Sequence, residues 1–103
     1  MNRLQQLLEF LKEDPDDPFT LYAIATEYLQ TDVEQARRYF EILLKSHPNY
    51  VPTYYHAAKL YEAFDEKDLA IKTYEKGIQQ ASEQNENLAL RELKNAYQEI
   101  LFD

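Results

Sequence analysis

The sequence contains no cysteine, and it has only one glycine and four prolines among its 103 residues. Without cysteine, neither a disulfide nor a zinc site built on thiolates can hold the fold together, so stability depends on packing. The dipeptides Asn-Gly and Asp-Gly, which favour tight hairpin turns, do not occur. The scarcity of glycine and of turn signals argues against a β-sheet protein and favours helices.

Basic residues are also scarce, because 11 lysines and arginines face 19 aspartates and glutamates and leave a net charge of −8. This balance argues against nucleic acid or a membrane surface as the partner, since both require concentrated basic residues. No apolar run approaches the 18 residues of a membrane span, and the N-terminus lacks the features of a signal peptide. We therefore expect a cytoplasmic protein.

Apolar residues are present in quantity, at 45% of the chain, and they recur with helical spacing in six segments. Their inward positions are Leu4, Leu7, Leu8 and Leu11; Leu21, Ile24, Ala25 and Tyr28; Ala36, Phe40, Leu43 and Leu44; Tyr54, Ala57, Ala58 and Tyr61; Ala70, Tyr74, Gly77 and Ile78; and Leu90, Leu93, Tyr97, Ile100 and Leu101. The connections between the segments are short. The sequence therefore predicts an all-α fold of about six helices arranged as antiparallel hairpins.

Polar residues mark several of the expected helix boundaries. Asp17 is expected to cap the second helix, and Asp32 with Gln35 forms a plausible capping box for the third. Asp65 is expected to cap the fifth helix, and the polar stretch 82–87 is expected to be a loop.

Two of the predicted helix pairs share one pattern at a nearly fixed period. Ala36 recurs as Ala70 after 34 residues, whereas Tyr28 recurs as Tyr61 after 33 residues. We interpret the difference of one residue as a shorter turn between the two helices of the first pair.

This pattern resembles the tetratricopeptide repeat family. The first copy supplies Leu21, Ile24, Ala25, Tyr28, Ala36, Phe40 and Pro48, and the second supplies Tyr54, Ala57, Ala58, Tyr61, Ala70, Tyr74 and Gly77. Leu43 and Ser82 depart from the small residue and the proline that the family has at those places. The resemblance implies stacked antiparallel hairpins that form a right-handed α-solenoid, in which small residues let neighbouring helices approach closely.

The resemblance extends to both ends of the chain. Leu7, Phe10, Leu11 and Pro15 match Phe40, Leu43, Leu44 and Pro48 at a constant offset of 33. We therefore expect a single domain made of a half-repeat helix at 1–16, repeats at 17–49 and 50–83, and a capping helix at 84–103. Lys94 stands where the family has a small residue, so no close partner helix is expected beyond the cap. A small free-standing protein and a fragment of a longer one both stay open.

In this family the first helices of successive pairs line a concave groove that binds other proteins. Carried over position by position, the groove would present Phe19, Tyr22, Thr26, Leu29, Tyr55, His56, Lys59, Glu62, Arg91, Asn95 and Gln98. We therefore predict a protein–protein interaction module that binds a peptide or a partner helix.

Individual groove positions allow two interpretations. Tyr22 and Tyr55 either anchor a partner or pack over the helix joints. Lys59 and Arg91 either receive an acidic group or are ordinary surface bases. The family's best-known carboxylate clamp is absent, since the corresponding places hold Tyr22, Thr26, His56, Leu88 and Glu92.

The sequence offers little for catalysis or metal binding. It has two histidines, of which His47 lies before a proline at a helix end and His56 lies on the predicted groove. Asp14, Asp16 and Asp17 lack the glycine and the terminal glutamate of a calcium loop and suit capping better. We expect no enzymatic activity, no cofactor and no metal.

Self-association is the alternative to partner binding. Leu88, Ile100 and Phe102 near the C-terminus are candidates for a dimer patch, so a monomer and a weak homodimer are both expected outcomes.

Overall fold

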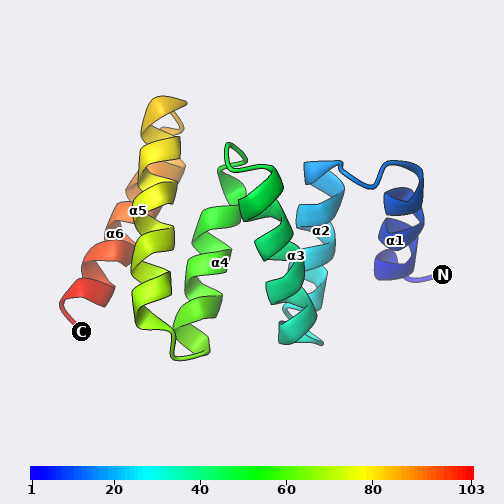
Figure 1. Cartoon of the computed structure of the whole chain (residues 1–103), viewed down its shortest axis with the longest axis horizontal. Coiled ribbons are helices and arrows are strands. Elements are labelled where there is room, and N and C mark those ends of the chain that lie inside the picture. Colours follow the sequence, from blue (N-terminus) through cyan, green and yellow to red (C-terminus); the bar gives the residue numbers. More distant parts are fainter. The chain divides into compact units, whose positions relative to one another are not determined.

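The computed structural model describes all residues, 1–103, as six α-helices without a strand. The chain divides into two compact units, an N-terminal unit at Met1–His47 and a C-terminal unit at Pro48–Asp103. Each unit contains three helices, which Figure 1 shows in chain order. The all-α fold of helical hairpins expected from the sequence is confirmed.

In the N-terminal unit, α1 (Arg3–Glu13) packs on α2 (Pro18–Tyr28), and α2 forms a hairpin with α3 (Val33–Ser46) (Figure 1). Asp17 caps α2 as predicted, because its carboxylate accepts hydrogen bonds from the Thr20 amide at 3.0 Å and hydroxyl at 2.6 Å. These two bonds lower the pKa of the Asp17 carboxyl. The capped end lets α2 start at Pro18, where a missing amide hydrogen costs no helical hydrogen bond.

The capping box predicted at Asp32 is only half present. The Asp32 carboxylate accepts the Gln35 amide at 3.2 Å, but the Gln35 side-chain oxygen is buried without a partner. A full capping box occurs instead at α1, where Asn2 and Gln5 bond each other's backbone amides.

The core of this unit follows the predicted stripes. Leu7 of α1 packs against Ala23 and Ile24 of α2, and Leu21, Ala25, Ala36, Phe40 and Leu43 are buried as well. Phe10 is an exception, because it is 59% exposed although its counterpart Leu43 is fully buried. Within its unit, α1 packs mainly on α2, and Phe10 lies on a part of the helix that stays exposed.

The C-terminal end of α3 is held within the same unit by His47. This residue is the C-cap of α3, and its Nε2 lies 2.9 Å from a carboxylate oxygen of Asp16 in the loop before α2. The predicted position of His47 at a helix end is therefore correct, and the structure adds a specific partner.

In the C-terminal unit, α4 (Pro52–Ala63) forms a hairpin with α5 (Lys67–Glu83), and α6 (Asn87–Leu101) packs on both (Figure 1). The predicted inward residues Tyr54, Ala57, Ala58, Tyr61, Ala70, Tyr74 and Gly77 are all buried. Gly77 lies at a close approach of helices, because a Cβ there would be 2.6 Å from the Tyr54 Cβ and 3.2 Å from a Leu93 methyl group. Any side chain at this position would clash with Tyr54 of α4, so the close packing requires glycine.

Two predicted boundaries in this unit are wrong. Asp65 does not cap α5, since Glu66 holds the N-cap position and Asp65 adopts a positive φ of 61°. The predicted loop at 82–87 is too long, because α5 continues to Glu83 and α6 already starts at Asn87.

Both errors have the same cause, a Schellman motif that ends the helix. After α4, the Glu66 amide bonds the Tyr61 carbonyl and the Asp65 amide bonds the Glu62 carbonyl. After α5, Asn85 has a φ of 60° and the same two bonds recur, from Glu86 to Ala81 and from Asn85 to Ser82. Glycine usually occupies this left-handed position, so its absence concealed the motif.

The turn of the first pair was also misassigned. The connection at 29–32 is longer than the one at 64–66, so the first pair does not have the shorter turn. The offset arises because α4 continues for two residues beyond Tyr61, whereas α2 ends at Tyr28.

None of the six helices combines the length and the apolar character needed to cross a bilayer.

Candidate functional site

The predicted groove residues of α2 are partly used for packing within the N-terminal unit. Tyr22 is half-buried, and its ring meets that of Phe40 edge-on with 6.4 Å between centroids. The Thr26 hydroxyl donates to the Ala23 carbonyl at 2.9 Å, and Leu29 is half-buried. Phe19, by contrast, is 69% exposed.

The predicted groove residues of α4 form a linked row of half-buried side chains. The Tyr55 ring contacts the His56 ring edge-on, with 6.0 Å between centroids, and the Lys59 ammonium lies 5.8 Å from the Tyr55 centroid. The same ammonium lies 3.8 Å from a carboxylate oxygen of Glu62. The row therefore holds its one cation between an aromatic ring and a carboxylate.

Glu62 is also fixed from the interior. The hydroxyl of the fully buried Tyr74 donates to the same Glu62 oxygen at 2.5 Å. Burial and this carboxylate together raise the pKa of Tyr74, so the phenol remains a donor. Glu62 therefore connects the surface of α4 with the core.

His56 carries no charge at neutral pH. Burial lowers the pKa of its imidazole below the ordinary value, because burial disfavours the charged form.

A polar pocket of about 190 Å³ lies between α4 and α6. Its lining residues are Tyr55, Lys59, Glu92, Asn95, Ala96 and Glu99. The structure thus brings Tyr55 and Lys59 of α4 together with Asn95 of α6, all three of which the sequence places in the groove. We call this cavity the α4–α6 pocket.

The sequence analysis did not place Glu92 and Glu99 in the groove. A usable signal was their spacing, because Glu92, Asn95 and Glu99 follow each other at i, i+3 and i+7 on one face of α6. Glu92 was considered only as a position at which a clamp residue is missing.

Arg91 and Gln98 line a different depression, of about 290 Å³, on α6 alone. Lys94 and Asn95 line it as well, and Arg91, Lys94 and Gln98 are all exposed. Asn95 therefore lies between two hollows, one with carboxylates and one with cations.

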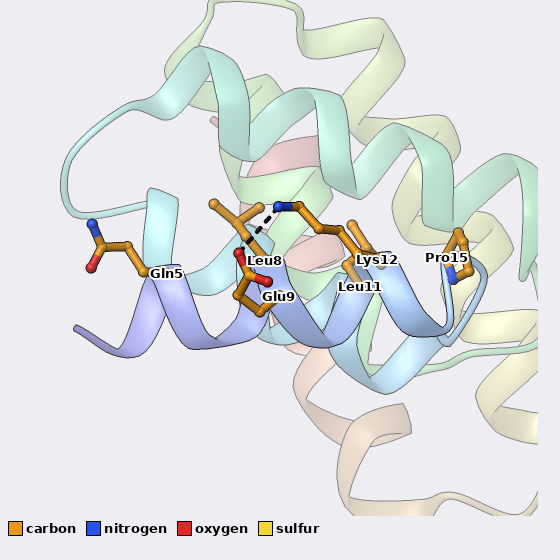
Figure 2. A pocket seen from close by; sticks show the side chains of 6 residues that line it. All are labelled: Gln5, Leu8, Glu9, Leu11, Lys12 and Pro15. Atoms are coloured by element: carbon orange, nitrogen blue, oxygen red, sulfur yellow. Dashed lines mark hydrogen bonds and ion pairs between the residues drawn. The ribbon is translucent and has the colours of Figure 1, made fainter. Parts of the chain in front are cut away.

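A further open depression, of about 520 Å³, lies on α1 in the N-terminal unit. Figure 2 shows its lining by Gln5, Leu8, Glu9, Leu11, Lys12 and Pro15. The Lys12 ammonium donates a hydrogen bond to the Glu9 carboxylate at 3.1 Å, so the one lysine that lines this depression is already paired.

The dimer patch considered from the sequence does not form as expected. Leu88 and Phe102 are exposed, at 61% and 88%, but Ile100 is buried at 5%. Leu93, Ala96 and Ile100 form the inward face of α6, and Leu101, predicted to point inward, is 46% exposed because it lies in the final turn.

Comparison with known proteins gives matches among solved structures. The solution NMR structure of a tetratricopeptide repeat domain protein from Salinibacter ruber is 46% identical, has a TM-score of 0.79, and aligns over 84% of this chain and 89% of its own. The crystal structure of a tetratricopeptide repeat domain protein from the same organism has the same identity and TM-score, over 82% of this chain and 96% of its own.

A more distant structure shares only the fold. The crystal structure of the MamA protein is 24% identical, with a TM-score of 0.69 over 95% of this chain and 56% of that one. No protein-family model matches the sequence, and no curated protein matches it.

Proposed function

This chain belongs to the tetratricopeptide repeat family, and we propose that it acts as an interaction module that binds a segment of another protein at the α4–α6 pocket. The observation that carries the proposal is the meeting of Tyr55, Lys59 and Asn95 around one cavity. An aromatic ring beside convergent polar groups is typical of interface anchor positions.

The proposal is for binding without catalysis. His56 is neutral and contacts an aromatic ring, and it does not line the pocket. Lys59 is held by Glu62, and the Glu62 carboxylate also accepts the Tyr74 hydroxyl. His56, Lys59 and Glu62 are thus engaged in fixing the surface of α4.

The groove residues of α2, which are Phe19, Tyr22, Thr26 and Leu29, remain a prediction from the sequence, as do His56, Glu62, Arg91 and Gln98 as contacts. The division into a half-repeat, two repeats and a cap is likewise retained as a proposal.

The test is capture of a partner from source lysate by the immobilised chain. Tyr55→Ala/Asn95→Ala is expected to lose a partner that the wild type captures, because the variant removes the ring and the amide that line the pocket. The matched control is Gln6→Ala, which removes an exposed side-chain amide of α1 outside the pocket.

Circular dichroism must show equal helical content in all three proteins. Equal capture by the wild type and the folded Tyr55→Ala/Asn95→Ala variant would contradict the proposed site. A separate Tyr22→Ala variant measures the contribution of α2.

A further inference from the structure

We infer that the α4–α6 pocket is specific for a basic side chain, so that the bound segment of the partner inserts a lysine or an arginine between Glu92 and Glu99. This inference rests on the proposed function and adds the chemical class of the group that is recognised.

The size of the pocket suits a single side chain. Its volume is about 190 Å³, whereas sites for drug-sized molecules have roughly 300–1,000 Å³. The pocket has an aromatic wall, Tyr55, and polar walls from both helices. A long side chain with an apolar stem and a polar end fits such walls.

The pocket already contains one cation, the Lys59 ammonium, but a neighbouring carboxylate balances its charge. The Lys59 ammonium lies 3.8 Å from Glu62, and the Tyr74 hydroxyl holds that same carboxylate oxygen in place at 2.5 Å. The charge of Lys59 is therefore matched within α4. Glu92 and Glu99 remain as two further negative charges on the opposite wall.

These two carboxylates are available to a ligand. Both are exposed and neither forms an ion pair within the chain. They lie on one face of α6 with the Asn95 amide between them. A guanidinium or ammonium group placed there can donate to carboxylate and amide oxygens while it lies near the Tyr55 ring.

An acidic group is disfavoured in the same pocket. It would compete with Glu62 for the Lys59 ammonium, and it would lie beside two unpaired carboxylates. Like charges so close disfavour binding, so the pocket discriminates by repulsion as well as by attraction.

The test uses two small probes on the full ¹⁵N-labelled chain, N-acetyl-arginine amide and N-acetyl-glutamic acid amide. Titration with the arginine probe is expected to shift the backbone amide resonances of Glu92, Asn95 and Glu99. Glu92→Gln/Glu99→Gln is expected to weaken this binding about fivefold, the effect of losing two solvent-exposed ion pairs. The glutamic acid probe is expected to leave these resonances in place.

The matched control is Glu13→Gln/Glu34→Gln, which removes two negative charges from exposed sites on α1 and α3. It is expected to bind the arginine probe as the wild type does. The inference is overturned by unchanged resonances with arginine, by shifts of similar size with glutamic acid, or by equal weakening in both double variants.

Failure of the proposed function has a different signature. In that case the arginine probe binds as expected, but Tyr55→Ala/Asn95→Ala captures the partner as well as the wild type does. If instead that variant loses the partner while the arginine probe fails to bind, the proposed function stands and the basic specificity does not.

Discussion

Buried hydroxyl groups in the C-terminal unit differ in whether they have a partner. The Thr73 hydroxyl donates to the Leu69 carbonyl at 2.8 Å, and the Tyr54 hydroxyl donates to the Pro48 carbonyl. Thr53 is fully buried in the first turn of α4, and its hydroxyl oxygen has no partner. A buried polar group without a hydrogen bond lowers stability, so Thr53 is a weak point of the core.

Thr53→Val is therefore expected to raise the free energy of unfolding by about 1 kcal/mol, because valine has the same shape without the unpaired oxygen. Thr73→Val is the matched control at a second buried threonine, and it is expected to gain less or to lose stability, since it removes a hydrogen bond. Urea denaturation at an unchanged m-value measures both. A larger gain for Thr73→Val would contradict this explanation.

At the scale of the helix, the ends of α4 and α5 show which local features the sequence reveals. The start of α2 was predictable, because Asp17 followed by a proline has one common structural meaning. The ends of α4 and α5 were not, because Asp65 and Asn85 take the left-handed position that a glycine would have signalled. An aspartate between two helices was interpreted as the start of the second when it belongs to the end of the first.

Gly77 provides a prediction about contact between helices. Gly77→Ala would gain about 1 kcal/mol of helix propensity, but its Cβ would lie 2.6 Å from the Tyr54 Cβ, an atom fixed to the backbone of α4. Overpacking of this kind costs about 1–3 kcal/mol or more. The net expectation is a loss of roughly 1 kcal/mol, measured by thermal or urea denaturation.

The neighbouring Lys76→Ala serves as its control, because Lys76 is exposed on the same helix. A change within about 0.5 kcal/mol is expected there. If Gly77→Ala were as stable as the wild type or more so, the close approach of α4 and α5 would not be the reason for the glycine.

At the scale of the whole molecule, the fold was predictable because one period repeats along the chain. The spacing of Ala36 and Ala70, and of Tyr28 and Tyr61, indicated the family and the fold class. The site was predictable only in part. The resemblance to the repeat family predicted Tyr55, Lys59 and Asn95 as groove positions, but the pocket also includes Glu92 and Glu99, whose place in it depends on how α6 packs against α4.

The excess of acidic residues is a property of the entire chain, with a net charge of −8. The ion pairs Arg3–Glu27, Lys12–Glu9 and Lys59–Glu62 are largely or partly exposed and contribute little each. Repulsion among the remaining carboxylates therefore outweighs the attraction that salt would screen.

The melting temperature is accordingly expected to rise when NaCl increases from about 0.01 M to about 0.15 M, as the screening length falls from about 30 to about 8 Å. Differential scanning calorimetry measures the change. Glu13→Gln/Glu34→Gln, with two fewer negative charges, is expected to show a smaller rise. A melting temperature that falls with salt would mean that the ion pairs dominate.

The two partners of Glu62, one in an ion pair and one in a hydrogen bond, have a consequence for how binding is detected. This carboxylate meets the Lys59 ammonium on the outside and the Tyr74 hydroxyl on the inside. A ligand that binds in the α4–α6 pocket and alters the Lys59–Glu62 ion pair therefore also alters the Tyr74–Glu62 hydrogen bond. That hydrogen bond joins α5 to α4. Amide hydrogen exchange along α5, a helix that does not line the pocket, then reports whether the pocket is occupied.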